Sequence, residues 1–317
     1  ELFVVAEHDE GASVQMKGVM FRKHIDRASV ARLIFTNRER TTIHVTINDT
    51  IHKVYNPEPG PEVQQIDIHT PIRSLEVRIA NPAGFIGYGI VFENKNGVSL
   101  DNYSIRGNSG LALFGTNAAV NARIGAMRGY DLIILQYGLN VMSADVLHYG
   151  SYEKAFIKVI NYMKRCFPNS SILVMGVCDR STQRDGEFVT MPAVRGMIEA
   201  QRNAARETGV AFWNTFEAMG GENSMVEFVR KNWAAKDYTH LGYAGGKFIA
   251  GKLVGNWMQG VEAEQQRRDR IEEERRKNEM LHYNRNDTIP GTIETETETD
   301  SDADADTTFT TNEFAQP

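Results

Sequence analysis

Cysteine is scarce in this 317-residue sequence, which has only two, too few for a disulfide scaffold. Cys166 precedes the strand-like run Ile172–Val177, and Cys178 follows it. A strand of this length separates its ends by roughly 20 Å, whereas a disulfide tolerates only about 7 Å between Cα atoms. We therefore predict two free thiols, which leave the redox compartment open.

Long apolar runs are also missing. None approaches the roughly 18 residues that a membrane span needs, so we expect no spanning segment. Nothing at the start resembles a signal peptide. The chain begins at Glu1 and enters a strand-like run directly, which is typical of a trimmed or truncated chain. The missing leader is therefore no argument for the cytoplasm.

Basic residues are absent after Arg285, whereas residues 291–317 hold eight acids. Without those eight, the chain has 33 acidic against 35 basic residues, counted from totals of 41 and 35. The folded body is thus close to neutral and has no global field that would attract nucleic acid. A neutral sugar or ester suits it better.

Residues 1–97 have the pattern of an all-β domain. Runs rich in β-branched and aromatic residues alternate with turn signals such as Asn81-Pro82-Ala83-Gly84. In Ile43-His44-Val45-Thr46-Ile47 apolar and polar residues alternate, as in a half-buried strand. About eight short strands in so short a stretch favour a β-sandwich or jelly roll. The predicted strands are Leu2–Val5, Ser13–Phe21, Val30–Thr36, Thr42–Ile47, Ile51–Tyr55, Val63–Ile68, Ile72–Ile79 and Phe85–Phe92.

Residues 98–258 have a different pattern, in which strands alternate with helices. This alternation predicts an α/β domain with βαβ units and a parallel sheet. The predicted strands are Val98–Leu100, Asp131–Leu135, Ile172–Val177 and Val210–Trp213, and the predicted helices are Tyr152–Cys166, Ala193–Thr208 and Ala244–Met258.

Two further segments follow. Residues 259–284 form a charged helix candidate with Glu272/Arg276 and Glu273/Lys277 at i,i+4. This segment lacks the heptads of a coiled coil, so we predict a solvated terminal helix. The acidic tail, residues 285–317, cannot bury enough apolar surface to offset its ordering entropy, and we expect it to be disordered.

Three polar clusters follow strands or precede the last helix, where parallel α/β sheets place their sites. They are residues 101–110, residues 136–140 and residues 237–240. The backbone N–H of Gly107 and the amide of Asn140 could form an oxyanion hole for an ester carbonyl. Asp237, three residues before His240, could orient the imidazole and stabilise its protonated form.

Each piece has a simpler interpretation when it stands alone. Gly-x-Asn after a strand is usually a turn, and a lone Asp-x-x-His is more often a chance match or a helix cap. The other histidines, such as His44 and His69, fit strand faces. The order of the three clusters strengthens the functional interpretation, because the 97 positions from Asn140 to Asp237 leave room for two βα units.

In this order the clusters resemble those of the SGNH/GDSL hydrolase family. Tyr103–Asn108 is similar to the block that carries the oxyanion glycine, although Gly110 could replace Gly107 in that role. Residues 131–140, which end in Gly-x-Asn, are similar to the next block, and Asp237-Tyr238-Thr239-His240 to the last one. The resemblance implies a three-layer, flavodoxin-like parallel-sheet domain over residues 98–258, with Asp237 and His240 catalytic and no metal or organic cofactor.

The departure from the family is the nucleophile, because the sequence contains no Gly-Asp-Ser. Ser104 and Ser109 lie near the site, but they belong to the oxyanion block. Family members that resemble peptidoglycan or carbohydrate O-acetylesterases insert a carbohydrate-binding-like β-sandwich between the serine block and the oxyanion block, and residues 1–97 match such an insertion. We therefore expect an N-terminally truncated chain whose serine lies upstream of Glu1.

The leading hypothesis is an esterase that acts on O-acylated carbohydrate or peptidoglycan, with no nucleic-acid partner. By resemblance it would be periplasmic or extracellular, and this chain alone would have little or no activity. A non-catalytic carbohydrate-binding or cell-surface protein on the same scaffold is the alternative. An acyltransferase is a weaker third.

Overall fold

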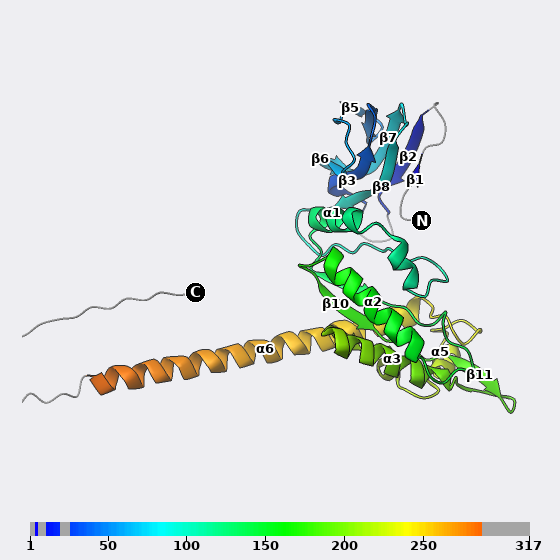
Figure 1. Ribbon diagram of the computed structural model, residues 1–317, viewed down its shortest axis with the longest axis vertical. Coiled ribbons are helices and arrows are strands. Elements are labelled where there is room, and N and C mark those ends of the chain that lie inside the picture. Colours follow the sequence, from blue (N-terminus) through cyan, green and yellow to red (C-terminus); the bar gives the residue numbers. More distant parts are fainter. Residues whose placement is uncertain (1–3, 6–10, 20–25, 287–317) are drawn as a thin grey trace, which may run out of the picture. The chain divides into compact units, whose positions relative to one another are not determined.

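The computed structural model describes residues 4–5, 11–19 and 26–286 (Figure 1). Its internal contacts divide the chain into two units, Glu1–Gly255 and Asn256–Pro317. The first unit contains a β-rich part and an α/β part. The predicted acidic tail lies outside the described residues from position 287 onwards, so its disorder stays a prediction.

The β-rich part consists of two four-stranded antiparallel sheets, with strand orders β1-β8-β3-β6 and β2-β7-β4-β5. The described residues up to position 97 contain strands and no helix, which agrees with the predicted all-β pattern, while the domain bounds and the jelly roll stay predictions. The strands are β1 (Val4–Val5), β2 (Ala12–Lys17), β3 (Ala28–Asn37), β4 (Thr42–Ile47), β5 (Ile51–Tyr55), β6 (Gln64–Ile72), β7 (Ser74–Ala80) and β8 (Phe85–Glu93).

One hydrophobic cluster joins the two sheets. Alternation directs Ile43, Val45 and Ile47 of β4 into this cluster, while His44 between them is exposed. From the other sheet, Phe35 stacks on Phe85 with ring centroids 5.2 Å apart. The period of two seen in the sequence therefore determines which face of each strand is buried.

The α/β part contains a three-stranded parallel sheet in the order β13-β10-β9, which confirms the parallel sheet predicted from the βαβ pattern. Helices α2 and α3 pack against each other (Figure 1). The elements are η1 (Leu111–Gly115), α1 (Ala118–Arg128), β9 (Leu132–Leu135), α2 (Gly150–Cys166), β10 (Ser171–Met175), β11 (Ser181–Arg184), β12 (Glu187–Thr190), α3 (Ala193–Thr208), β13 (Ala211–Trp213), α4 (Thr215–Met219), α5 (Ser224–Arg230) and α6 (Tyr243–Asn286).

Strand β9 lies at the edge of this sheet within the described residues. Its apolar side chains Leu132 and Ile134 are each 38% exposed. Strands of parallel sheets are normally covered on both faces and read as continuous apolar runs. The exposure of two apolar side chains of β9 is therefore unusual for a strand of a parallel sheet.

One prediction about secondary structure is wrong. Val98–Leu100 is not a strand, and Val98 and Leu100 are almost fully exposed, because no neighbouring strand pairs with this short apolar run. Residues 259–284 are helical, as predicted, and they continue the helix that begins at Tyr243, since α6 runs without a break to Asn286. Gly260 alone does not end it, because one glycine inside a helix costs only about 1 kcal/mol.

Arg128 connects the β-rich part to the α/β part. Its guanidinium donates to Glu93 on β8 at 2.9 Å and to Asp101 at 3.0 Å, and the side chain is only 3% exposed. Tyr130 also donates to Asp101 at 2.6 Å. Burial, followed by its bond to Asp101, raises the pKa of Tyr130 above its usual range. The two carboxylates thus share one buried cation.

Both cysteines are buried free thiols, as predicted. Burial raises the pKa of Cys178 to about 12, so this thiol is chemically inert at neutral pH. No described helix is both long enough and apolar enough to cross a membrane.

Gln201 on α3 ties the ends of two strands together. Its fully buried side chain donates from Nε2 to the carbonyl oxygen of Tyr137, beyond β9, at 2.8 Å. Its Oε1 accepts from the backbone N–H of Val177, beyond β10, at 3.0 Å. One side chain therefore satisfies two buried backbone groups that no strand partner reaches.

Replacing Gln201 by leucine should lower the free energy of unfolding by about 2 kcal/mol or more, because two buried backbone groups lose their partner. Urea unfolding followed by circular dichroism measures this change. Gln183→Leu, at an exposed position on β11, is the matched control and should change stability by less than about 0.5 kcal/mol. Equal effects of the two substitutions would contradict the bridging role.

Candidate active site

The segment Asp237–His240 lies in a loop that is closed at its base. Ala234 and Leu241 form an antiparallel bridge, and the N–H of Ala235 donates to the carbonyl oxygen of His240 at 2.8 Å. Helix α6 begins directly after this base, at Tyr243. The loop is therefore anchored on both sides.

Inside the loop the carboxylate of Asp237 makes three hydrogen bonds. Its Oδ2 lies 2.8 Å from Nδ1 of His240, and its Oδ1 accepts from the N–H groups of Thr239 and His240 at 2.9 and 3.1 Å. An ionised carboxylate can only accept, so Nδ1 of His240 carries the proton. Nε2 is then free to take up a proton from another group. This is the orientation that a histidine base requires.

The bond to His240 lowers the pKa of Asp237 to about 2, with the two backbone N–H bonds acting in the same direction. The carboxylate is therefore ionised throughout the neutral range. The side chains of Asp237 and His240 are 50% and 75% exposed, so the surrounding water weakens their attraction. Their arrangement matters for chemistry more than for stability.

Gly138 lies in the middle of the second cluster, at a position that requires glycine. Its φ is +108°, and a Cβ there would lie 2.8 Å from Val177 and 2.9 Å from Nε2 of Gln201. Two residues later, Nδ2 of Asn140 donates to the carbonyl oxygen of Asn108 at 3.3 Å. The structure thus brings Asn140 to the loop that carries Gly107.

The two candidate oxyanion glycines differ in their surroundings. Gly107 has φ +75° and is exposed, with no atom within 4 Å of the position of a Cβ. Gly110 has φ +90°, and a Cβ there would lie 2.9 Å from the ring of Tyr137. Gly110 is therefore needed for packing, whereas Gly107 leaves open space in which a ligand could approach its backbone. The oxyanion role of Gly107 stays a prediction.

One dipeptide, Arg180-Ser181, contacts both halves of the site. The guanidinium of Arg180 donates to the carbonyl oxygen of Leu139 at 3.3 Å, between Gly138 and Asn140. The N–H of Ser181 donates to the carbonyl oxygen of Tyr238 at 3.0 Å, between Asp237 and His240. Sequence reasoning missed this connection. Because Arg180 and Ser181 are neighbours, their two hydrogen bonds hold the Asn140 loop and the His240 loop close to each other.

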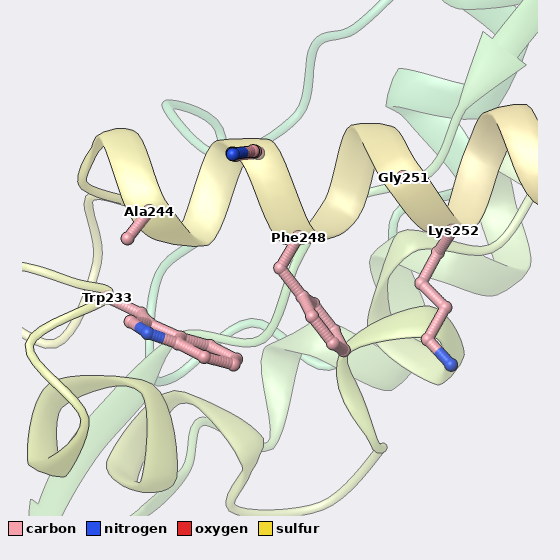
Figure 2. A pocket seen from close by; sticks show the side chains of 6 residues that line it. Trp233, Ala244, Phe248, Gly251 and Lys252 are labelled. Carbon is pink, nitrogen blue, oxygen red and sulfur yellow. The ribbon is translucent and has the colours of Figure 1, made fainter.

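A surface pocket of about 450 Å³ is lined by Trp233 and by residues of α6, and its lining includes none of the predicted site residues. In Figure 2, Ala244, Phe248 and Lys252 project from the side of α6 that faces Trp233. Lys252 lies over the ring of Phe248, with its Nζ 5.5 Å from the centroid. Among the described residues no cluster of His, Cys, Asp and Glu is arranged to hold a metal ion.

Neither a protein-family model nor a curated protein matches the sequence. Solved structures do match the fold. A peptidoglycan O-acetylesterase has a TM-score of 0.54 at 18% identity, over 80% of this chain and 76% of its own. A GDSL-like lipase from Parabacteroides merdae has a TM-score of 0.35 at 14% identity, over 46% of this chain and 66% of its own. A family 3 carbohydrate esterase from Talaromyces cellulolyticus has a TM-score of 0.35 at 16% identity, over 50% and 70%.

The match to the peptidoglycan O-acetylesterase extends over both the β-rich and the α/β pattern, since it covers four fifths of the chain. The chain therefore has an SGNH/GDSL hydrolase-like fold, as the motifs predicted.

Replacing His240 by glutamine should raise the pKa of Asp237 from about 2 towards its ordinary 3.8, because the largest cause of the lowering is removed. The carboxyl ¹³C signal of Asp237, followed by NMR between about pH 1.5 and 6, measures this change. Since the folded pKa is depressed, the stabilisation by the pair is present above pH 3.8 and is lost as the pH falls through about 2.

His148→Gln is the control, because His148 is exposed and lies outside the Asp237 loop. It should leave the pKa of Asp237 near 2. A pKa near 2 in His240→Gln as well would mean that the backbone N–H groups alone hold the carboxylate.

Proposed function

We propose that this protein is an ester hydrolase that removes acyl groups from O-acylated carbohydrate or peptidoglycan by a Ser-His-Asp mechanism. The 2.8 Å bond between Asp237 and Nδ1 of His240 carries the proposal, because it leaves Nε2 as a proton acceptor. The fold, which is similar to that of a peptidoglycan O-acetylesterase, supports it.

The site residues divide the steps of the proposed reaction between them. His240 takes the proton of the serine hydroxyl as the serine oxygen bonds to the ester carbonyl carbon, and Asp237 stabilises the imidazolium that forms. The oxyanion accepts from the N–H of Gly107 and the amide of Asn140. His240 then returns the proton to the leaving sugar hydroxyl. In the second half of the reaction His240 takes a proton from water, whose oxygen bonds to the acyl carbon; the bond to the serine oxygen breaks, the serine regains its proton from His240 and the free acid leaves. No metal or organic cofactor is needed.

We place the serine on a strand that adds to the edge of β9, from a segment upstream of Glu1. The position of β9 at the end of the strand order supports this placement, since within the described residues one side of its backbone is left without a partner strand. A strand parallel to β9 would have its carboxyl end beside that of β9, which is the end of the sheet where Asn140 lies. The 75% exposure of His240 is consistent with a missing neighbour.

The β-rich part, residues 1–97, is on this proposal a jelly-roll, carbohydrate-binding-like insertion ahead of the hydrolase part at 98–258. Its strand orders β1-β8-β3-β6 and β2-β7-β4-β5 support a jelly roll, because successive strands alternate between the two sheets except at β4 and β5, which pair as one hairpin. A glycan substrate also agrees with a periplasmic or extracellular location.

Hydrolysis of p-nitrophenyl acetate tests the proposal. The chain that begins at Glu1 should show little or no turnover, whereas a form extended upstream should be active. Replacing His240 by glutamine in the extended form should lower kcat by about 10³-fold or more. His148→Gln is the matched control and should leave kcat unchanged.

Two results would contradict this proposal. Turnover by the short chain that Ser104→Ala or Ser109→Ala abolishes would move the nucleophile into residues 104–109. An inactive extended form whose residues 1–97 bind a glycan array would indicate a carbohydrate-binding protein without catalysis.

A further inference from the structure

The hairpin formed by β11 and β12 is outside the catalytic roles assigned above. Its strands pair in register, with Ser181 opposite Thr190 and Gln183 opposite Phe188. The two-residue turn is Asp185-Gly186, with φ of +52° and +87°. Positive φ at both positions matches the twist of paired strands. The hairpin is thus a locally well-formed element.

Its base is fixed to the rest of the α/β part. The N–H of Thr190 donates to Oδ1 of Asn223 at 2.9 Å, and the N–H of Asn223 donates to Oγ1 of Thr190 at 2.7 Å. The N–H of Met191 donates to the carbonyl oxygen of Arg180 at 2.7 Å, which closes the hairpin. Its position relative to α5 is therefore set by reciprocal bonds.

From this base the hairpin contacts the Asp237–His240 loop twice. The ring of Phe188 stacks on the ring of Tyr238, with centroids 3.7 Å apart and planes 10° from parallel. The N–H of Ser181 holds the carbonyl oxygen of Tyr238. Tyr238 also packs against the hydrophobic cluster that contains Met175 and Phe228. Both the backbone and the ring of Tyr238 are therefore held.

Tyr238 needs this support because of its backbone. Its φ of +54° lies in the left-handed region, which residues other than glycine rarely adopt. Such a conformation persists only where the surroundings hold it in place. His240 is 75% exposed, so packing around its own ring contributes little. The geometry of the Asp237–His240 pair then depends on how Tyr238, between them, is held.

We propose that the β11–β12 hairpin is the positioning element of the catalytic loop and that Phe188 is its positioning residue, acting through the ring of Tyr238. The bond from Arg180 to Leu139 connects the same hairpin base to the Asn140 loop. One hairpin thus sets the base and the oxyanion donor relative to each other. The catalytic meaning of this inference rests on the proposed function.

Phe188→Ala tests it. Phe188 is 38% exposed, so its removal should leave the fold intact and the midpoint of thermal unfolding within about 4 °C of the parent. The fraction of neutral His240 protonated at Nδ1, measured by ¹⁵N–¹H NMR at about pH 9, should fall at least about twofold. Without the stack, the imidazole reverts towards the tautomer mixture of a free ring.

Two matched variants complete the test. Phe188→Tyr keeps an aromatic ring on Tyr238 and should retain the Nδ1-protonated form. Gln183→Ala, opposite Phe188 in the hairpin, removes a side chain of similar length that does not stack on Tyr238, and it should also behave as the parent. In a form with esterase activity, Phe188→Ala should lower kcat at least about tenfold with little change in KM.

An unchanged His240 tautomer in Phe188→Ala would overturn the inference, as would equal loss in Gln183→Ala. This readout needs no turnover, so it separates the inference from the proposed function. An inactive extended form with a tautomer that depends on Phe188 would reject the esterase proposal and leave the positioning role in place.

Discussion

The two hydrogen bonds of Gln201 hold the end of the sheet where the site forms. Tyr137 and Val177 follow neighbouring parallel strands, and their backbone groups point into a region where no strand partner reaches them. By satisfying both, Gln201 fixes the spacing of the two strand ends. Gly138 must then be glycine, because its Cβ would occupy the space of the Gln201 amide. The close approach of Gln201 to Gly138 thus helps to set the path of the backbone from Gly138 to Asn140.

The two halves of the site are constrained in different ways. Asp237 and His240 are three residues apart, so their bond forms within one loop, which the β11–β12 hairpin supports. Asn140 and Asn108 are 32 residues apart and meet because the sheet and its loops bring them together. The local half can keep its geometry when the sheet is perturbed, whereas the oxyanion half cannot. Arg180 and Ser181 connect the two halves, since each donates a hydrogen bond to one of them.

Features encoded over a few residues could be predicted from the sequence. The alternation in Ile43–Ile47 gave the buried face of β4, and Asp-x-x-His gave a hydrogen-bonded pair. Val98–Leu100 was predicted wrongly because strand formation depends on a partner, which a three-residue pattern does not reveal. The Asp185-Gly186 turn signal could have located the β11–β12 hairpin. Its contact with Tyr238 joins residues 50 positions apart, so it becomes visible only in the fold.

The exposed segment around Val98 and Leu100 has a consequence for proteolysis. Backbone without hydrogen-bonded structure and with exposed apolar side chains is readily cut by proteases that prefer such residues. Arg128 binds Glu93 on one side of this segment and Asp101 on the other. After a cut at Leu100, the ion pair between Arg128 and Glu93 would still join the two fragments. The nicked protein would migrate as one particle until a denaturant separated its pieces.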